Sequence, residues 1–293
     1  RDSYYITNDF DFNNIKYSTT SYSYYGILNG GYHTIKNVNS VGYNTAGIAL
    51  FPDLNGIVKN LKVEDSVFTN TSGNAGAIAG RASIGAKLEN IQVENTKVSG
   101  TKYVGGLIGY ILDNNTSFVS TCDKCSFAGT IEATSKSTDL TVGGIIGYTT
   151  KGIVRNSYNK GSINITISSD NKVLASGILN GPTSDKNIEN CYNIGEIVVN
   201  STNERATIVT NGLNATENAK VKNSYYLEDD NYTNNNDYSR TKEQLLDKDN
   251  YVDWDFIDTW YMNNDYPILR TFPTEVTDIN TDLFSNTLNT NSE

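Results

Sequence analysis

Several residue types that carry common chemistry are scarce in this chain. It has one histidine, one methionine, four prolines and three cysteines in 293 residues. A single histidine rules out the H-E-x-x-H zinc motif. The pair Cys122 and Cys125 has the spacing of a metal or redox motif, but His33 lies some 90 residues away, about three rungs of the repeat described below, so a four-ligand zinc site has too few partners. We therefore expect no metal and no cofactor.

Basic residues are also outnumbered, and long apolar runs are missing. The chain has 23 Lys and Arg against 33 Asp and Glu, a formal net charge of −10 and a pI of about 4.7. This charge repels nucleic acids and anionic membrane surfaces. The apolar runs span only a few residues, well below what a membrane helix requires. The opening RDSYYITNDF has no initiating Met and no apolar signal core, which we interpret as a segment of a longer protein.

What the chain does contain is a repeat rich in Gly, Asn, Tyr, Ser, Thr and Ile. VGGLIGY at 104–110 returns as VGGIIGY at 142–148, with fainter copies at 46, 75 and 176. A second element follows each copy, for example KNLKVED from 59 and ENIQVEN from 89. Spacings of about 30 to 40 residues indicate a solenoid. Leu61 and Val63 alternate with charged residues, a period of two that is typical of strands.

The repeat therefore predicts an all-β fold, a right-handed parallel β-helix of about seven rungs with a small C-terminal cap. Equivalent positions stack into columns along its axis. The recurring glycines predict either a tight backbone bend or the close approach of a neighbouring sheet. The Asn column predicts a turn in which side-chain amides bond to backbone and to one another. Its members are Asn60, Asn90, Asn156, Asn190 and Asn223, with Lys124 as the exception.

These motifs carry a resemblance. GGLIGY and GGIIGY resemble the GLUG repeat of bacterial surface and secreted proteins. The stretch from LFPDLNG at 50 to ENIQVEN at 89 is similar to the region upstream of the catalytic domain in immunoglobulin A-specific zinc metallopeptidases of Gram-positive bacteria. The likeness spans most of residues 3–272. It implies a β-helix, but the zinc peptidase motif of that family is absent from this sequence.

Three regions are predicted. Residues 1–228 form the parallel β-helix. Residues 229–272 form a C-terminal cap with a short helix, in which Thr241 is the N-cap and large aromatic residues cover the last rung. Residues 273–293 have little periodicity and are predicted to be a linker or disordered tail.

Catalytic candidates are few. Cys125 shares an inward column with Ile91, Ser157 and Cys191, so we expect free, buried thiols; a strained local bridge between Cys122 and Cys125 is the alternative. His33 is expected at the surface or a rung edge. Glu64 and Glu94 share an outer column next to Lys62, a pattern typical of a solvated face. We therefore predict no enzyme; the alternative is a polysaccharide lyase or hydrolase on a β-helix scaffold.

Binding is the favoured function. Tyr158, Tyr192, Tyr225 and Tyr226 recur in successive rungs, and exposed tyrosines on rigid strands suit contact with proteins and sugars. The alternative is that these rings stack on one another and stabilise the solenoid. The acidic stretch 228–237 lacks the spacing and glycine of an EF-hand and is expected to be a solvated loop rather than a Ca²⁺ site.

The sequence thus predicts a non-catalytic recognition, adhesion or spacer module of a secreted or cell wall-attached Gram-positive bacterial protein, a monomer within a larger polypeptide. It would position substrate for a neighbouring immunoglobulin A protease-like domain. The expected partner is a host protein or glycan, with immunoglobulin among the candidates, and no nucleic acid or membrane span is expected.

Overall fold

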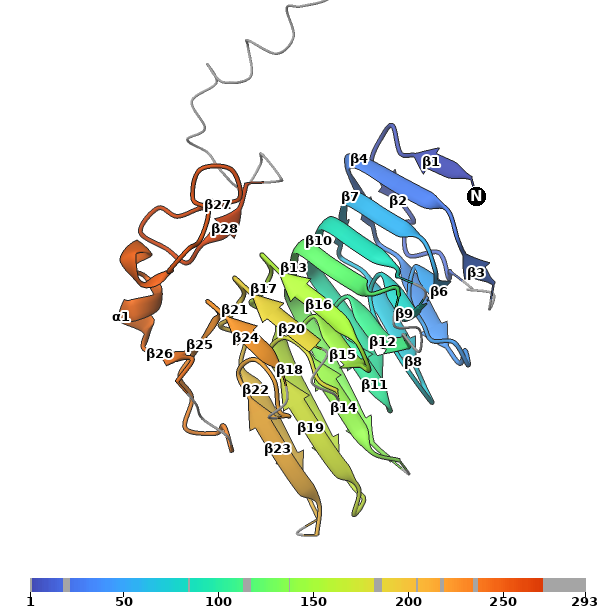
Figure 1. Ribbon diagram of the computed structural model, residues 1–293. Helices are drawn as coiled ribbons and strands as arrows, with labels where there is room; N and C mark the ends of the chain where they lie inside the picture. The colour runs from blue at the N-terminus through green and yellow to red at the C-terminus, as the bar shows by residue number, and fades with distance from the viewer. Residues whose placement is uncertain are drawn as a thin grey trace, which may run out of the picture.

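A computed structural model describes residues 2–17, 22–83, 85–112, 117–136, 138–181, 186–203, 205–216, 219–233 and 237–270. Parallel strands stack along one axis in it, with the N-terminal strands at one end and the C-terminal helix beside the last strands (Figure 1). In the described part of the chain no helix has the length and hydropathy of a membrane span.

Most strands belong to one large parallel sheet, here called sheet A. It contains β1 (Ser3–Tyr5), β2 (Phe10–Asp11), β4 (Ile27–Lys36), β5 (Asn39–Gly42), β7 (Ile57–Glu64), β8 (Val67–Asn70), β10 (Lys87–Gly100), β13 (Ser120–Ser135), β16 (Gly152–Arg155), β17 (Tyr158–Asn159), β18 (Ser162–Ile167), β20 (Lys186–Glu189), β21 (Tyr192–Asn193), β22 (Ile197–Ser201), β24 (Lys220–Lys222), β25 (Tyr225–Leu227) and β26 (Ser239–Arg240).

Two smaller parallel sheets close the solenoid. Sheet B contains β3 (Ser23–Tyr24), β6 (Phe51–Leu54), β9 (Ala79–Ser83), β12 (Ile108–Leu112) and β15 (Ile146–Thr149). Sheet C contains β11 (Tyr103–Gly105), β14 (Leu140–Gly143), β19 (Lys172–Ser176) and β23 (Thr207–Asn211). From β10 to β15 the chain visits sheets A, C and B in turn, twice, so each of these two circuits adds one strand to each sheet.

Strand register confirms the predicted columns. Leu61 pairs with Ile91, and Ile91 pairs with Cys125. All three are fully buried in the single core that runs along the solenoid axis. The predicted parallel β-helix is therefore confirmed, with about six turns where about seven were expected.

The asparagine column is a left-handed backbone position repeated along the axis. Asn60, Asn90, Asn156, Asn190 and Asn223 have φ between 47° and 55°, and Lys124 has φ 54°. Asn tolerates this conformation better than most residues because its short side chain bonds locally. The amides also bond along the column: Asn90 Nδ2 donates to Asn60 Oδ1 at 2.8 Å. Lys124 interrupts the ladder, and Asn156 Nδ2 donates to Asp123 Oδ1 instead, at 3.0 Å.

The repeated glycines are required by close packing. A Cβ on Gly144 would lie 2.0 Å from the carbonyl oxygen of Gly177 and 2.6 Å from Asn159 Cγ. Gly144 does not have a positive φ, so the close approach of a neighbouring sheet, not a special bend, explains it. Two aligned positions are wrong. Ala75 pairs with Val104, which places Gly76 level with Gly105 rather than Gly106. Ile48 pairs with Ala75, which places Gly47 level with Asn74 rather than Gly76.

Opposite these glycines, buried asparagines fill the interior. Asn159 and Asn193 are fully buried, and Asn159 Nδ2 donates to Asn193 Oδ1 at 2.7 Å. Each also accepts from the backbone N–H two residues later, at Gly161 and Gly195. Small glycines on one sheet and bonded asparagines on the other let the two sheets meet without an unsatisfied amide.

The C-terminal segment forms a small aromatic cap. It contains α1 (Lys242–Leu245), the 3-10 helix η1 (Lys248–Asn250) and an antiparallel pair, β27 (Trp260–Tyr261) and β28 (Ile268–Leu269). Thr241 is the N-cap of α1, as predicted, and it also forms a capping box with Gln244. Because β26 pairs with β25, sheet A continues past residue 228. The predicted region boundaries remain predictions, and residues 273–293 lie outside the described residues.

Candidate functional site

The predicted tyrosine strip is buried. Tyr158, Tyr192 and Tyr225 have exposed fractions of 3%, 0% and 6%. The rings of Tyr158 and Tyr192 stack with centroids 5.1 Å apart, and the Trp260 ring lies 6.1 Å from each. Tyr192 Oη donates to the carbonyl of Pro267 at 2.5 Å. The rings of Tyr158, Tyr192 and Tyr225 form the surface against which the cap packs.

The Tyr226 side chain lies on the opposite face of sheet A from that of Tyr225. Successive residues of a strand face opposite sides of the sheet, so Tyr226 enters the solenoid interior and is fully buried. Its ring lies against Gly212 and contacts Tyr232 with centroids 5.4 Å apart. The exposure that a binding strip of Tyr158, Tyr192, Tyr225 and Tyr226 requires is therefore not found. Ring stacking, the alternative, describes the first two of these residues.

The cysteines are free and buried, as predicted. Cys125 Sγ donates to the carbonyl of Asp123 at 3.3 Å, and Cys191 Sγ to that of Glu189 at 3.2 Å. Ser157 and Ser224 donate to the equivalent carbonyls of their own rungs. Thiol and hydroxyl groups therefore form the same hydrogen bond in this column. Burial raises the pKa of the Cys191 thiol. Within the described ranges no group of three or more His, Cys, Asp and Glu residues is arranged to hold a metal ion.

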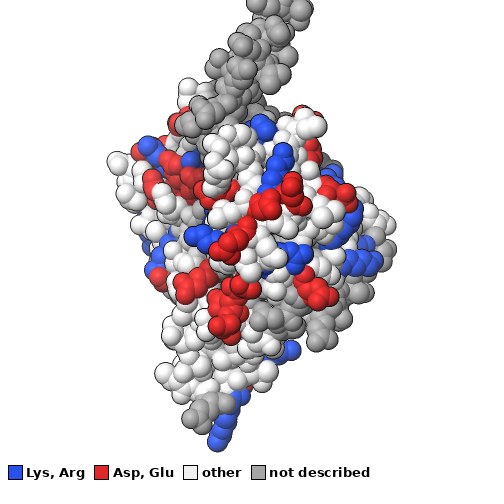
Figure 2. Space-filling view, turned by 90° about the vertical axis from the view of Figure 1, so that its left-hand side faces the viewer, with Lys and Arg blue, Asp and Glu red and all other residues white. Residues whose placement is uncertain are grey.

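The acidic candidates are held in ion pairs. Glu64 and Glu94 pair across β7 and β10, and Lys62 Nζ lies between them, 3.2 Å from Glu64 and 2.6 Å from Glu94. Arg155 pairs with Asp123 in the same sheet, at 2.9 Å. On the face shown in Figure 2, Lys and Arg side chains lie between the Asp and Glu side chains. This pattern matches the predicted solvated face.

His33 lies at the N-terminal edge, where its Nδ1 is 3.2 Å from Asp9 Oδ1. The acidic stretch 228–237 is described only in part, because residues 234–236 lie outside the described ranges. In its described part, Glu228, Asp229, Asp230 and Asn231 line an open depression together with Ser239.

Sequence reasoning missed an outer aromatic corner between sheets B and C. The tyrosine that closes the glycine motif, Tyr110, packs with Tyr103 and Tyr148, with centroids 4.5 to 5.6 Å apart. Burial raises the pKa of all three phenols. In the same column as Tyr110 and Tyr148, Arg81 bonds the buried Asp53 through Nε and Nη2 at 3.0 and 2.8 Å. The rings of Tyr103, Tyr110 and Tyr148 are half-buried and pack against one another.

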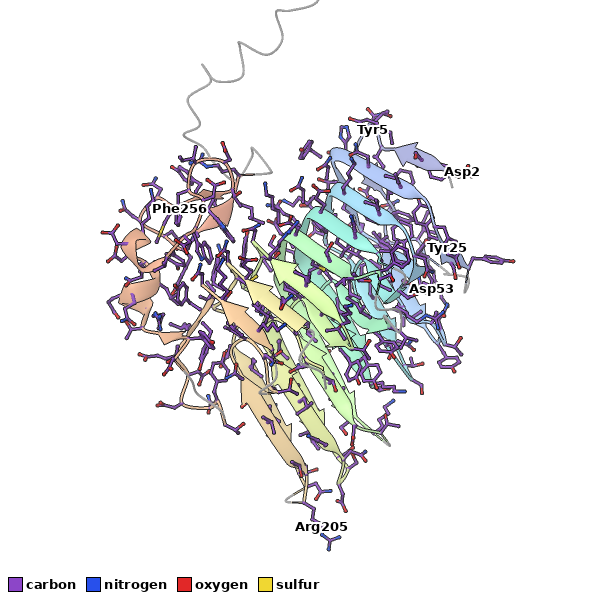
Figure 3. All side chains as sticks on the ribbon, in the orientation of Figure 1. Asp2, Tyr5, Tyr25, Asp53, Arg205 and Phe256 are labelled. Atoms are coloured by element: carbon purple, nitrogen blue, oxygen red, sulfur yellow. The ribbon has the colours of Figure 1, made fainter. Side chains whose placement is uncertain are left out.

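A second aromatic group, also missed, is exposed. Most of the exposed large apolar side chains fall in the first two rungs. We call them the N-terminal aromatic surface: Tyr4, Tyr5, Phe10, Ile15, Tyr22, Tyr25, Ile27, Tyr32, Val41 and Tyr43. Among the described residues only Phe118, Val252 and Ile257 add to this list elsewhere. Figure 3 shows Tyr5 and Tyr25 at separate corners of the N-terminal end. The signal in the sequence was the aromatic density of the opening segment.

Comparison with known proteins agrees with the fold. The family model described as the GLUG motif matches residues 139–166. The structure is similar to that of a Bacteroides ovatus protein named "putative immunoglobulin A1 protease", with a TM-score of 0.59 and 17% sequence identity over 92% of this chain and 86% of that one. At this identity the likeness shows the fold alone. A comparison with curated proteins gives no match.

Proposed function

We propose that this chain is a non-catalytic recognition module of an extracellular bacterial protein, and that it binds through the N-terminal aromatic surface. One observation carries the proposal: the exposed large apolar side chains gather at the N-terminal end of the solenoid, whereas the aromatic residues of the C-terminal cap are buried against Tyr158, Tyr192 and Tyr225. Exposed apolar side chains that gather in one region of a protein favour an interaction site there.

The rigidity of the scaffold supports this role. Strands β1 and β2 pair with β4, and β4 also pairs with β7, so side chains at the N-terminal end are held with little freedom to lose on binding. Glu64 and Glu94, the carboxylates that a carbohydrate-active enzyme would use, both form ion pairs with Lys62, which favours binding over catalysis. The GLUG motif and the structural relative support an extracellular setting.

The partner is tested directly. The purified chain is passed over immobilised immunoglobulin A, matrix proteins and a glycan array, because the name of the structural relative makes immunoglobulin A the first candidate. We expect saturable binding to at least one of these partners that is lost in a Tyr4→Ala/Tyr25→Ala variant. Phe118→Ala is the matched control, since Phe118 is an exposed aromatic outside the first two rungs. Absence of saturable binding, with the fold intact by circular dichroism, would leave the spacer function as the better explanation.

A further inference from the structure

Strand β4, on the second rung, contains a bulge at a position where β7 and β10 pair without one. In the pairing of β4 with β7, Asn29 is opposite Lys59 and His33 is opposite Leu61, so Gly30, Gly31 and Tyr32 together face Asn60. A bulge adds residues to one strand and re-aims its side chains, and such bulges occur next to functional sites. The two glycines are needed here: a Cβ on Gly30 would lie 2.3 Å from the Asn60 carbonyl oxygen, and one on Gly31 would lie 2.6 Å from that of Ile6.

The bulge holds a tyrosine in a disfavoured conformation. Tyr32 has φ 63° and occupies the column in which Asn60 and Asn90 adopt the same left-handed backbone. Asn suits this position, whereas a bulky aromatic residue is crowded there. The Tyr32 side chain is nevertheless half exposed, at 50%. A strained, exposed aromatic residue where the fold prefers Asn points to a function at this place.

Tyr5 and Asp9 lie against the two chain neighbours of Tyr32, Gly31 and His33. The ring of Tyr5, 62% exposed, lies over Gly31, whose Cβ would be 3.0 Å from Tyr5 Cζ and Oη. Asp9 Oδ1 accepts from the Thr34 backbone N–H at 3.0 Å and lies 3.2 Å from His33 Nδ1, while the Asp9 side chain stays 67% exposed. The Thr34 bond holds the Asp9 pKa below its usual value, so this carboxylate is an acceptor at neutral pH.

The charge around these residues is nearly balanced. The described residues up to 43 include three acidic residues, Asp2, Asp9 and Asp11, and two basic ones, Lys16 and Lys36. Lys36 Nζ is 3.8 Å from Asp11 Oδ2. The whole chain carries a net charge of −10, which disfavours an acidic polymer. Exposed phenol rings pack on the C–H faces of a sugar, and a carboxylate accepts from its hydroxyl groups. These features favour a neutral ligand that has apolar faces and many hydrogen-bond donors.

We infer that the Gly30–Tyr32 bulge builds a binding site for a neutral saccharide, with the rings of Tyr5 and Tyr32 as the platform and Asp9 as the hydroxyl acceptor. This inference rests on the proposed recognition function and names its ligand class. It places the ligand on the first two rungs rather than on the buried tyrosines of the later rungs.

The test measures saccharide affinity and stability on the same variants. The full chain is titrated with neutral oligosaccharides (β-glucan, mannan, galactan and N-acetylglucosamine oligomers) and with an acidic glycosaminoglycan as a comparison. We expect binding to a neutral oligosaccharide that weakens about tenfold in Tyr5→Ala and in Tyr32→Asn. Tyr32→Asn is the diagnostic variant, because it should raise the melting temperature by relieving the crowded backbone while it removes the ring. Phe118→Ala should change neither quantity.

Three results would overturn the inference, and they differ in meaning. If Tyr32→Asn and Tyr5→Ala bind the neutral oligosaccharide as tightly as the parent chain, the site is not on the bulge. If only a protein or an acidic glycan binds, and that binding is lost in the Tyr4→Ala/Tyr25→Ala variant, the ligand class is wrong but the recognition function stands. If no partner in the panel binds, both the saccharide site and the recognition function are rejected.

Discussion

At the residue scale, the left-handed column has one position whose residue does not suit it. Lys124 has φ 54°, and Asn90 Oδ1, one rung away, is buried without a hydrogen-bond partner. An Asn at position 124 tolerates this backbone and can donate to that oxygen. We expect Lys124→Asn to stabilise the protein by about 1 kcal/mol, measured by urea unfolding.

Lys124→Ala is the matched control for this prediction. It removes the same long side chain but supplies no amide and keeps a Cβ in the left-handed region. Equal stability of the Asn and Ala variants would show that the ladder hydrogen bond and the backbone preference contribute nothing here.

The glycine motif makes an opposite prediction. Gly144→Ala places a methyl group 2.0 Å from a carbonyl oxygen that belongs to the backbone of the next rung, so neither neighbour can move without shifting a strand. We expect a loss of about 3 kcal/mol, seen as a lower urea midpoint. Gly42→Ala should stay within about 0.5 kcal/mol of the parent chain, because a Cβ there meets no atom within 4 Å.

At the element scale, an ion pair joins β6 to β9. Burial would raise the pKa of Asp53, but the bonds from Arg81 and Ser23 outweigh it and hold that pKa below its usual 3.8. A carboxyl group whose pKa is lowered by folding stabilises the protein above its unfolded pKa, and this contribution disappears as the pH falls through the folded value. The stabilisation should therefore be complete above about pH 5 and decline below about pH 4.

Asp53→Asn tests this pH dependence. We expect it to cost about 2 kcal/mol at pH 7 and progressively less toward pH 3, as followed by chemical unfolding at each pH. Glu132→Gln is the control, since the pair of Glu132 with Lys97 is exposed on both sides and should have little effect. A constant difference between Asp53→Asn and the parent chain from pH 7 to pH 3 would contradict the assignment.

At the scale of the whole molecule, the two ends of the solenoid are treated differently. Trp260 is fully buried and packs on Trp254, with ring centroids 4.4 Å apart, above the Tyr158 and Tyr192 rings. Trp254 Nε1 also donates to the Asn223 carbonyl at 2.7 Å. The cap is thus fastened to the outer face of the last rungs as well as to their end.

We expect Trp260→Ala to loosen the cap by about 3 to 5 kcal/mol while the solenoid stays folded. Trp254 is then the one remaining tryptophan, and its fluorescence reports the cap alone. An early fluorescence transition, ahead of the loss of the β circular dichroism signal, is the expected result. The control is Ile257→Ala, at a cap residue with 82% exposure. A single coincident transition would show that the cap and solenoid unfold as one unit.

The sequence predicted the repeat columns well because each column is a local requirement that every rung repeats. Asn60 and Asn90 occupy a backbone position that few residues tolerate, and Leu61 and Ile91 follow the period of a strand. The N-cap at Thr241 was predictable for the same reason, since its bonds lie within one turn. The alignment was wrong by one residue at Gly76, because the next rung has two adjacent glycines, Gly105 and Gly106, and the sequence gave no way to choose between them. It was also wrong at Gly47, which lies level with Asn74.

The sequence by itself therefore determined the parallel β-helix, the buried thiols and the pairing of Glu64 with Glu94 around Lys62. Only the tertiary structure decided which tyrosines are exposed. Tyr158 and Tyr192 are covered by a cap that lies about 70 to 100 residues further along the chain, whereas Tyr5 and Tyr32, on the first two rungs, stay 62% and 50% exposed. Exposure depends on which distant segment packs on a side chain, and strand periodicity contains no information about that contact.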